Sequence, residues 1–143
     1  MSDWMLYHVW RIRGYEVKHC ERVEPDRLVV TITAKPNSLC CPCCGSKHVI
    51  RKGVNLRLLR GTPVGRTQVL FAAHVPRVRC DRCRLTRQVR IPFADEKRRH
   101  TRQFERYALQ LAQLTTTAHA ARHLGVAWDT VRDIESRYLG KQY

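Results

Sequence analysis

The feature that most constrains this chain is two pairs of cysteines, each with two residues between its members. The first pair falls in the run Cys-Cys-Pro-Cys-Cys-Gly at residues 40–45, and the second is Cys80 with Cys83. Two such pairs can converge on one metal ion, because each forms a tight turn that directs two thiolates at one point. Four thiolates fill a tetrahedral shell, which predicts a structural zinc ion and argues against a catalytic one.

The first run contains cysteines in two overlapping registers, 40/43 and 41/44. We expect the second register. Pro42 then fixes the backbone just after the first ligand, and Gly45 follows the second ligand, where the chain turns back past the metal. The predicted zinc ligands are Cys41, Cys44, Cys80 and Cys83.

Alternatives to this ligand set stay open at the level of sequence. In the other register Cys40 and Cys43 bind the metal, and His48 or His74 can replace a thiolate. A redox pair or a group of buried thiols is the alternative to any metal site. Cys20 stands alone in an expected strand and is predicted to be a core residue.

The charge balance favours an anionic partner. Lys and Arg number 27, of which 21 are Arg, against 12 acids, so the formal net charge is +15. A small chain with this excess repels itself unless an anion shares the charge, and nucleic acid is the commonest such partner. Residues 47–90 contain twelve basic residues and one acid, Asp81. Because solvated surfaces normally mix both signs, this segment predicts a phosphate-binding surface that includes Arg82 and Arg84 beside the second cysteine pair.

Length and composition fit one domain or two small ones. The chain has 143 residues, of which 43% are hydrophobic, enough for a modest core. Its longest apolar run, Val69–Ala73, is too short to cross a bilayer. The odd cysteine count and the absence of a secretion-signal pattern argue against a disulfide framework and favour a cytoplasmic location.

Residues 1–92 are predicted to form a β-rich zinc-ribbon domain with flanking strands, so the expected fold class is α+β. Residues 27–35 alternate clearly, with Leu28, Val30, Ile32 and Ala34 on one face. The expected elements are a short helix at 3–10, strands at 15–24 and 27–35 joined at Pro25-Asp26, an irregular segment at 49–59 interrupted by Gly61-Thr62-Pro63 and Gly65, and strands at 66–79 and 85–91.

Residues 93–143 are predicted to be a small all-α domain with a helix-turn-helix. A charged connector leads to a helix that Thr101 can cap. A second helix is expected at 117–124 and a third from Ala127 or Trp128, with Gly125 able to take the positive φ of the turn between them. An ordinary helical hairpin is the alternative interpretation.

The last helix supplies the predicted base contacts. Val131 and Ile134 are expected to face the other helices, which leaves the opposite side to DNA. Arg132 can bind guanine, and Asp129 can accept from cytosine or else only stabilise the helix N-terminus. The predicted DNA-binding residues on this helix are Trp128, Asp129, Arg132, Ser136 and Arg137.

The connector adds a second group of basic residues. Arg98, Arg99 and Arg102 follow one another closely just before the helices. They are predicted to contact the DNA backbone or minor groove, and a solvated linker is the alternative.

The order of these parts resembles the N-terminal region of bacterial insertion-sequence transposases of the ISL-three group. The resemblance rests on Cys41-Pro42-Cys43-Cys44-Gly45, on the basic segment that ends in Arg77-Val78-Arg79-Cys80-x-x-Cys83, and on the helix-turn-helix. It implies a non-catalytic module that binds the terminal inverted repeats of a transposon. The DDE catalytic domain of that family is expected to begin where this chain stops, at Tyr143.

Three forms of this function stay open: a truncated transposase, a separate DNA-binding partner of a catalytic transposase subunit, and a stand-alone repressor. The module can also act as a homodimer. An RNA-binding zinc-ribbon protein and a nuclease active by itself are the competing classes.

Overall fold

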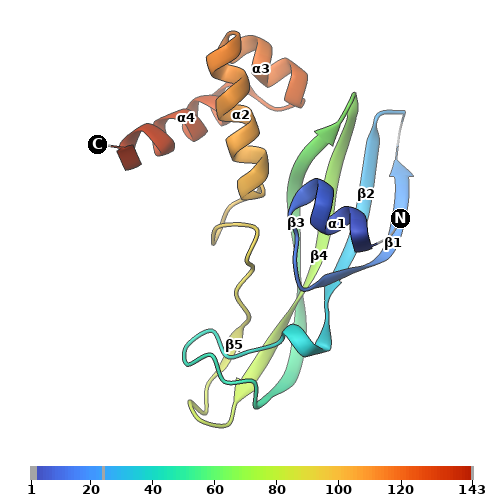
Figure 1. Cartoon of the computed structure of the whole chain (residues 1–143), viewed down its shortest axis with the longest axis vertical. Coiled ribbons are helices and arrows are strands. Elements are labelled where there is room, and N and C mark those ends of the chain that lie inside the picture. The colour runs from blue at the N-terminus through green and yellow to red at the C-terminus, as the bar shows by residue number, and fades with distance from the viewer. Residues whose placement is uncertain (1–2, 24, 143) are drawn as a thin grey trace.

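The computed structural model describes residues 3–23 and 25–142, and it has a mixed β-sheet followed by three helices (Figure 1). This arrangement confirms the α+β class. The elements are helix α1 (Asp3–Trp10), strands β1 (Tyr15–Val23) and β2 (Arg27–Ala34), a 3₁₀ turn (Pro36–Ser38), strands β3 (Val49–Val64), β4 (Thr67–Cys80) and β5 (Thr86–Gln88), and helices α2 (Arg102–Leu114), α3 (Thr117–Leu124) and α4 (Trp128–Gln142).

The sheet combines local and distant pairings. Its strand order is β1-β2-β4-β3, and β5 joins β4 beyond the end of β2. The β2–β4 pairing is parallel, while the others are antiparallel. The predicted hairpin between β1 and β2 is present, although Glu24 lies outside the described residues. Val30, Ile32 and Ala34 are buried, as their alternation predicts.

The long β3–β4 hairpin differs from the sequence expectation. Gly61-Thr62-Pro63 does not interrupt β3, which continues to Val64. Gly61 fits there because it packs beneath Phe71, and a Cβ would overlap that ring. Pro63 falls where the register shifts between Gly61 and Val64, so its missing N–H breaks no ladder hydrogen bond. The turn itself is at Gly65, with φ 60°.

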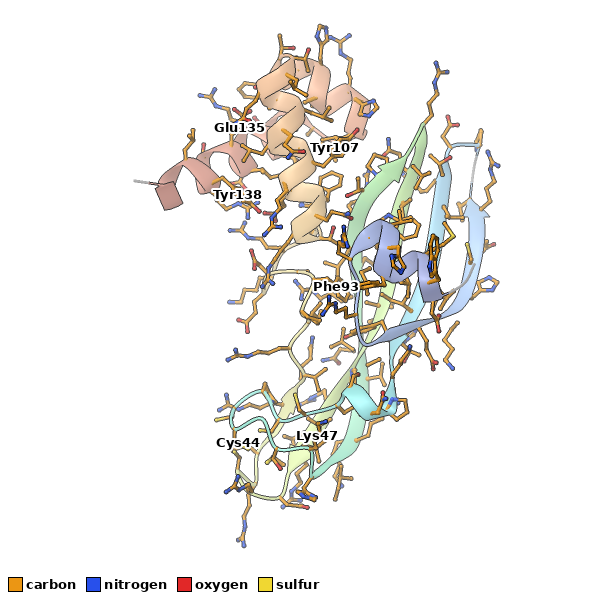
Figure 2. The ribbon with its side chains drawn as sticks, in the orientation of Figure 1. Cys44, Lys47, Phe93, Tyr107, Glu135 and Tyr138 are labelled. Carbon is orange, nitrogen blue, oxygen red and sulfur yellow. The ribbon has the colours of Figure 1, made fainter. Side chains whose placement is uncertain are left out.

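Helix α1 lies against one face of the sheet near β3 and β4 (Figure 1). Its Trp10 ring meets Phe71 edge to face at 5.4 Å, and the Trp10 indole N–H donates to the Thr62 carbonyl at 2.9 Å. Phe93, from the connector after β5, packs against Tyr15 on the same core (Figure 2). The connector is therefore attached to the sheet before the helices begin.

The three C-terminal helices form a second core. Thr101 caps α2 as predicted, with its hydroxyl accepting from the Phe104 N–H at 3.1 Å. Helix α3 spans the predicted residues and ends at Gly125, whose φ is 67°. The buried residues of this core are Phe104, Ala108, Ala120, Ala121, Leu124, Val131 and Ile134. Within the described ranges, no helix has both the length and the apolar character needed to cross a membrane.

Candidate metal centre and nucleic-acid interface

The four predicted metal ligands come together at the end of the sheet where β4 finishes. The Sγ atoms of Cys41, Cys44, Cys80 and Cys83 all lie within 4.8 Å of one another. Two edges of this group, Cys41 to Cys83 and Cys44 to Cys80, measure 3.9 and 3.5 Å. A tetrahedral ion with Zn–S bonds of about 2.3 Å has sulfur–sulfur edges of about 3.8 Å. The group therefore suits a metal ion bound by four thiolates.

The two cysteine turns share one backbone geometry. In the first, the Gly45 N–H donates to the Cys41 carbonyl at 2.9 Å, and Gly45 has φ 74°. In the second, the Arg84 N–H donates to the Cys80 carbonyl at 2.8 Å, and Arg84 has φ 54°. Glycine takes this left-handed conformation freely, whereas arginine takes it at a cost. The second turn therefore accepts strain to bring its two thiols to the same point.

Backbone hydrogen bonds prepare one thiol for metal binding. The N–H groups of Cys44 and Cys43 lower the pKa of Cys41 to about 6, which favours the thiolate that a metal requires. The pKa of Cys83 is raised, first by its hydrogen bond with Cys44 and then by burial. A bound divalent cation would favour the thiolate at every one of these positions.

The alternative ligands lie outside the cluster. Cys40 and Cys43 are exposed, and Cys20 is half-buried at the margin of the sheet core. Among the described residues, the group close enough to share a metal contains neither His48 nor His74.

The turn between α3 and α4 has the geometry of a helix-turn-helix. The N–H groups of Gly125 and Val126 both donate to the Ala121 carbonyl, which closes the end of α3. Val131 and Ile134 are fully buried against the other two helices, as predicted. Helix α4 is thereby fixed with its opposite side open to solvent.

The exposed side of α4 contains most of the predicted base contacts. Trp128 is 48% exposed, and the Arg132 guanidinium lies over its ring, 5.4 Å from the centroid. Asp129 and Ser136 are also exposed. Arg132 has no carboxylate partner in the described part of the chain, so its donors are available to a ligand.

Arg137 is placed differently from the other predicted contacts. Its side chain is only 19% exposed, and it pairs with the buried carboxylate of Glu105 at 3.1 Å. It also donates to Asp133 at 3.1 Å. The pairing with Glu105 ties α4 to α2, whereas the bond to Asp133 lies within α4, so both contacts of Arg137 are internal.

The connector arginines divide in the same way. Arg102 donates to the Asp95 carboxylate at 2.8 Å and to the Pro92 carbonyl at 2.9 Å. Arg98 lies 3.8 Å from the carboxylate of Asp133 and is partly exposed. Arg99 has an exposed side chain, while its carbonyl accepts from the Arg60 backbone N–H. Of these three arginines, Arg99 is the one that the described contacts leave most open to solvent.

Two residues that the sequence did not single out attach the helices to the sheet. The Arg60 guanidinium, on β3, donates to the carbonyls of Leu124 at 2.7 Å and Gly125 at 3.4 Å. Gln68, on β4, accepts from Arg60 at 2.8 Å and donates to the His123 carbonyl at 3.1 Å. A cation at the C-terminal carbonyls of a helix is favoured by the helix dipole. No local sequence pattern signals this contact, because 55 or more residues separate its partners.

The cysteine cluster and the helix-turn-helix lie at opposite ends of the sheet. Figure 2 shows Cys44 at one end and Tyr107 and Glu135 at the other. Twelve residue steps along β4 separate Gln68, at the helical end, from Cys80, which at about 3.3 Å per step is about 40 Å. Arg82 and Arg84, both exposed beside the cluster, are therefore far from Arg132.

The helical part of this chain is similar to a domain found in transposases. Residues 89–139 match the family model described as the helix-turn-helix domain of transposase family ISL3, which agrees with the resemblance seen in the sequence. Over 131 residues, 89% of this chain, the sequence is 27% identical to the transposase for insertion sequence element IS1001 of Bordetella parapertussis. The chain spans 32% of the length of that relative. No solved structure matches this chain.

Proposed function

We propose that this chain binds double-stranded DNA in a sequence-specific way, at the ends of a transposable element, with α4 in the major groove. The observation that supports this most directly is the geometry of α4. Its apolar side, formed by Val131 and Ile134, is buried against the other helices. Its N-terminal half presents Trp128 and Arg132 to solvent. Helix-turn-helix proteins place this half of the last helix against base edges.

In this proposal Arg132 recognises a guanine. A guanidinium can donate to O6 and N7 of that base together. Stacking on Trp128 already restricts the conformations of the Arg132 side chain, so less conformational entropy is lost on binding. Trp128 offers an apolar edge to a neighbouring thymine methyl group. Asp129 and Ser136 are the further contacts that we propose on this helix.

We propose zinc as the ion held by Cys41, Cys44, Cys80 and Cys83. Thiolate sulfur in a tetrahedral set favours zinc, and four protein ligands leave no open position for chemistry. The ion would fix the two cysteine turns and with them the exposed Arg82 and Arg84. These two arginines are proposed to bind phosphates.

The separation of the two ends predicts a long DNA site. A span of about 40 Å exceeds one turn of B-DNA, about 34 Å. We propose that the metal-bearing part, residues 1–92, contacts the backbone about one turn away from the groove that holds α4. The helical part, residues 93–143, supplies base recognition. Arg98 and Arg99 are proposed to contact the DNA backbone between the site of α4 and that of the metal-bearing part. A cytoplasmic location, where thiols stay reduced, belongs to the same proposal.

The experiment that tests this function is selection of bound duplexes from a random pool, followed by affinity measurements on the selected sequence. We expect a slope of log K against log salt of about −5 to −7, which corresponds to six to eight neutralised phosphates. Arg132→Ala should cost about 1–3 kcal/mol and relax the preference at one base pair. Arg82→Ala should weaken selected and random duplexes alike.

Other outcomes separate the competing functions. Equal affinity for selected and random duplexes would contradict sequence-specific binding, and a preference for structured RNA would favour an RNA-binding protein. Cleavage of DNA by the purified chain with magnesium would show that the chain acts by itself as an enzyme, which this proposal does not include. Sedimentation of the DNA complex distinguishes a monomer from a homodimer, and addition of a catalytic transposase subunit tests the partner role.

A further inference from the structure

We propose that the tip of the β3–β4 hairpin is a second DNA contact beside the recognition helix, in which Arg66 binds the phosphates that border the groove holding α4. This inference rests on the proposed function, because it places the hairpin relative to DNA bound by α4. The hairpin would act as a wing on a helix-turn-helix, although it belongs to the sheet that also bears the cysteine cluster.

The hairpin is held directly against the turn of the helix-turn-helix. Arg60 and Gln68, on its two strands, together bond three consecutive carbonyls at the end of α3, those of residues 123–125. The approach is close, since a Cβ on Gly125 would lie 3.3 Å from the Gln68 amide. Helix α4 begins three residues after this glycine, at Trp128. The hairpin is thus attached at the entrance to the recognition helix.

The tip extends only slightly beyond that attachment. Val64 pairs with Thr67 across a connection of two residues, and Gly65 takes φ 60° to close it. Arg66 lies two residues before Gln68, which on a strand corresponds to about 7 Å. Its side chain is exposed, and it forms no ion pair with a carboxylate of the described residues. The tip therefore presents a free guanidinium close to the start of α4.

The surroundings of the tip are also basic. Arg27, on β2, is the register partner of Gln68 on the adjacent strand and is exposed. Arg122, in the last turn of α3, is exposed as well. One acid, Asp26, precedes Arg27 in the chain, and its backbone carbonyl accepts from the Gln68 N–H. The excess of positive charge favours an anion over an uncharged base edge as the ligand, and with α4 in the proposed groove the adjacent anion is a DNA phosphate.

The geometry favours a backbone contact over base recognition at this position. The N-terminal residues of a recognition helix contact base edges, so the phosphate walls of the groove lie beside the turn that precedes the helix. The hairpin is attached at that turn. A long, flexible side chain at a two-residue connection suits a phosphate, which tolerates variation in approach, better than a base edge, which requires a fixed one.

The test compares four forms of the full chain with zinc bound: the wild type, Arg66→Ala, Arg66→Lys and Lys18→Ala. Lys18 is a matched control, because it is exposed on β1 at the opposite edge of the sheet and its loss removes the same charge. We expect Arg66→Ala to weaken binding about three- to tenfold on selected and random duplexes alike, and to reduce the salt slope by about 0.9. Arg66→Lys should recover most of the loss, and Lys18→Ala should change affinity less than twofold.

Hydroxyl-radical footprinting locates the contact. With Arg66→Ala, protection should disappear at the sugars bordering the α4 groove beside the hairpin and remain at the other protected sugars of the site. If Arg66→Ala and Lys18→Ala behave alike in affinity, salt slope and footprint, the hairpin contact is wrong while the proposed function stands. If the wild type shows no preference for any duplex, the proposed function itself fails.

Discussion

The cysteine end of the sheet and the helical end maintain their shape by different means. Residues 40–48 and 81–88 are mostly exposed, and of the twelve residues other than cysteine in them none is buried in the described structure. The helices instead bury Phe104, Leu124 and Ile134 completely around one core. We therefore expect the proposed metal ion to stabilise the first region, while apolar packing stabilises the second. Metal removal and core substitution should affect the two ends separately.

The largest expected effect is the loss of one metal ligand. Structural zinc contributes about 10–16 kcal/mol in small zinc-binding peptides, as much as the whole stability of many domains. Cys41→Ser should abolish stoichiometric zinc binding and unfold the cysteine end, while the helical circular-dichroism signal persists. Elemental analysis and thermal unfolding with and without a chelator measure both effects.

Cys40→Ser is the matched control for that experiment. Cys40 adjoins Cys41 but is exposed and lies outside the cluster, so its loss should leave the zinc content unchanged. If Cys40→Ser releases the metal and Cys41→Ser does not, the other register binds it. If chelation leaves thermal unfolding unchanged, the chain does not depend on a metal.

A core substitution in the helices should have the next largest effect, and it should destabilise the helical end instead of the cysteine end. Leu124 is fully buried, and Leu124→Ala should destabilise the helical unit by about 2–5 kcal/mol through lost burial and a cavity. Zinc content should not change. Leu114→Ala, at a position 84% exposed, is the control and should change stability by less than about 0.5 kcal/mol. Loss of zinc together with the helices would show that the two ends fold as one unit.

A third substitution sharpens the distinction between DNA contacts and internal contacts on α4. Arg137→Ala leaves the buried Glu105 without its partner, so it should destabilise the helical unit by about 3 kcal/mol. Arg132→Ala removes an exposed side chain and should leave stability nearly unchanged while altering DNA preference. Urea unfolding and duplex binding of both variants decide between these roles.

The double variant Glu105→Gln/Arg137→Gln provides the check on that interpretation. It removes both charges, so it should be more stable than Arg137→Ala. If Arg137→Ala is as stable as the wild type but binds DNA much more weakly, Arg137 is a DNA contact as the sequence alone suggested.

Sequence patterns predicted correctly those helix ends that are set by residues close by in the sequence. Thr101 and Gly125 marked the start of α2 and the end of α3, because a cap acts within one helical turn. The Gly61-Thr62-Pro63 run misled for the opposite reason. Its glycine is needed for packing against Phe71, a residue whose position depends on the whole hairpin. Periodicity and caps cannot reveal a requirement that arises across the sheet.

The candidate site likewise has features that the local sequence predicts and features that depend on distant residues. Cysteine spacing and the turn residues Pro42 and Gly45 predicted which four thiols lie together. The attachment of the helices through Arg60 and Gln68 could not be predicted, since it joins residues 55 or more apart. The internal pairing of Arg137 escaped prediction because α4 periodicity places it near the exposed side, and only α2 brings Glu105 to it.

The smallest expected effect is a pH dependence at the junction where the helices join the sheet. His100 stacks on Phe104, and burial, reinforced by Arg60 and neighbouring arginines, lowers its pKa from 6.5 to about 4. The folded state therefore holds a neutral His100, while the unfolded chain takes up a proton below about pH 6.5. Its contribution to stability is complete above pH 6.5 and is lost progressively as the pH falls towards 4.

The melting temperature of the wild type should thus fall more between pH 7.5 and 5 than that of His100→Gln. His19→Gln, at a side chain 67% exposed, is the control and should follow the wild type. Because acid also affects thiolates and carboxylates in every form, the difference between His100→Gln and the wild type is the measured quantity, and equal pH profiles would contradict a buried neutral histidine at this junction.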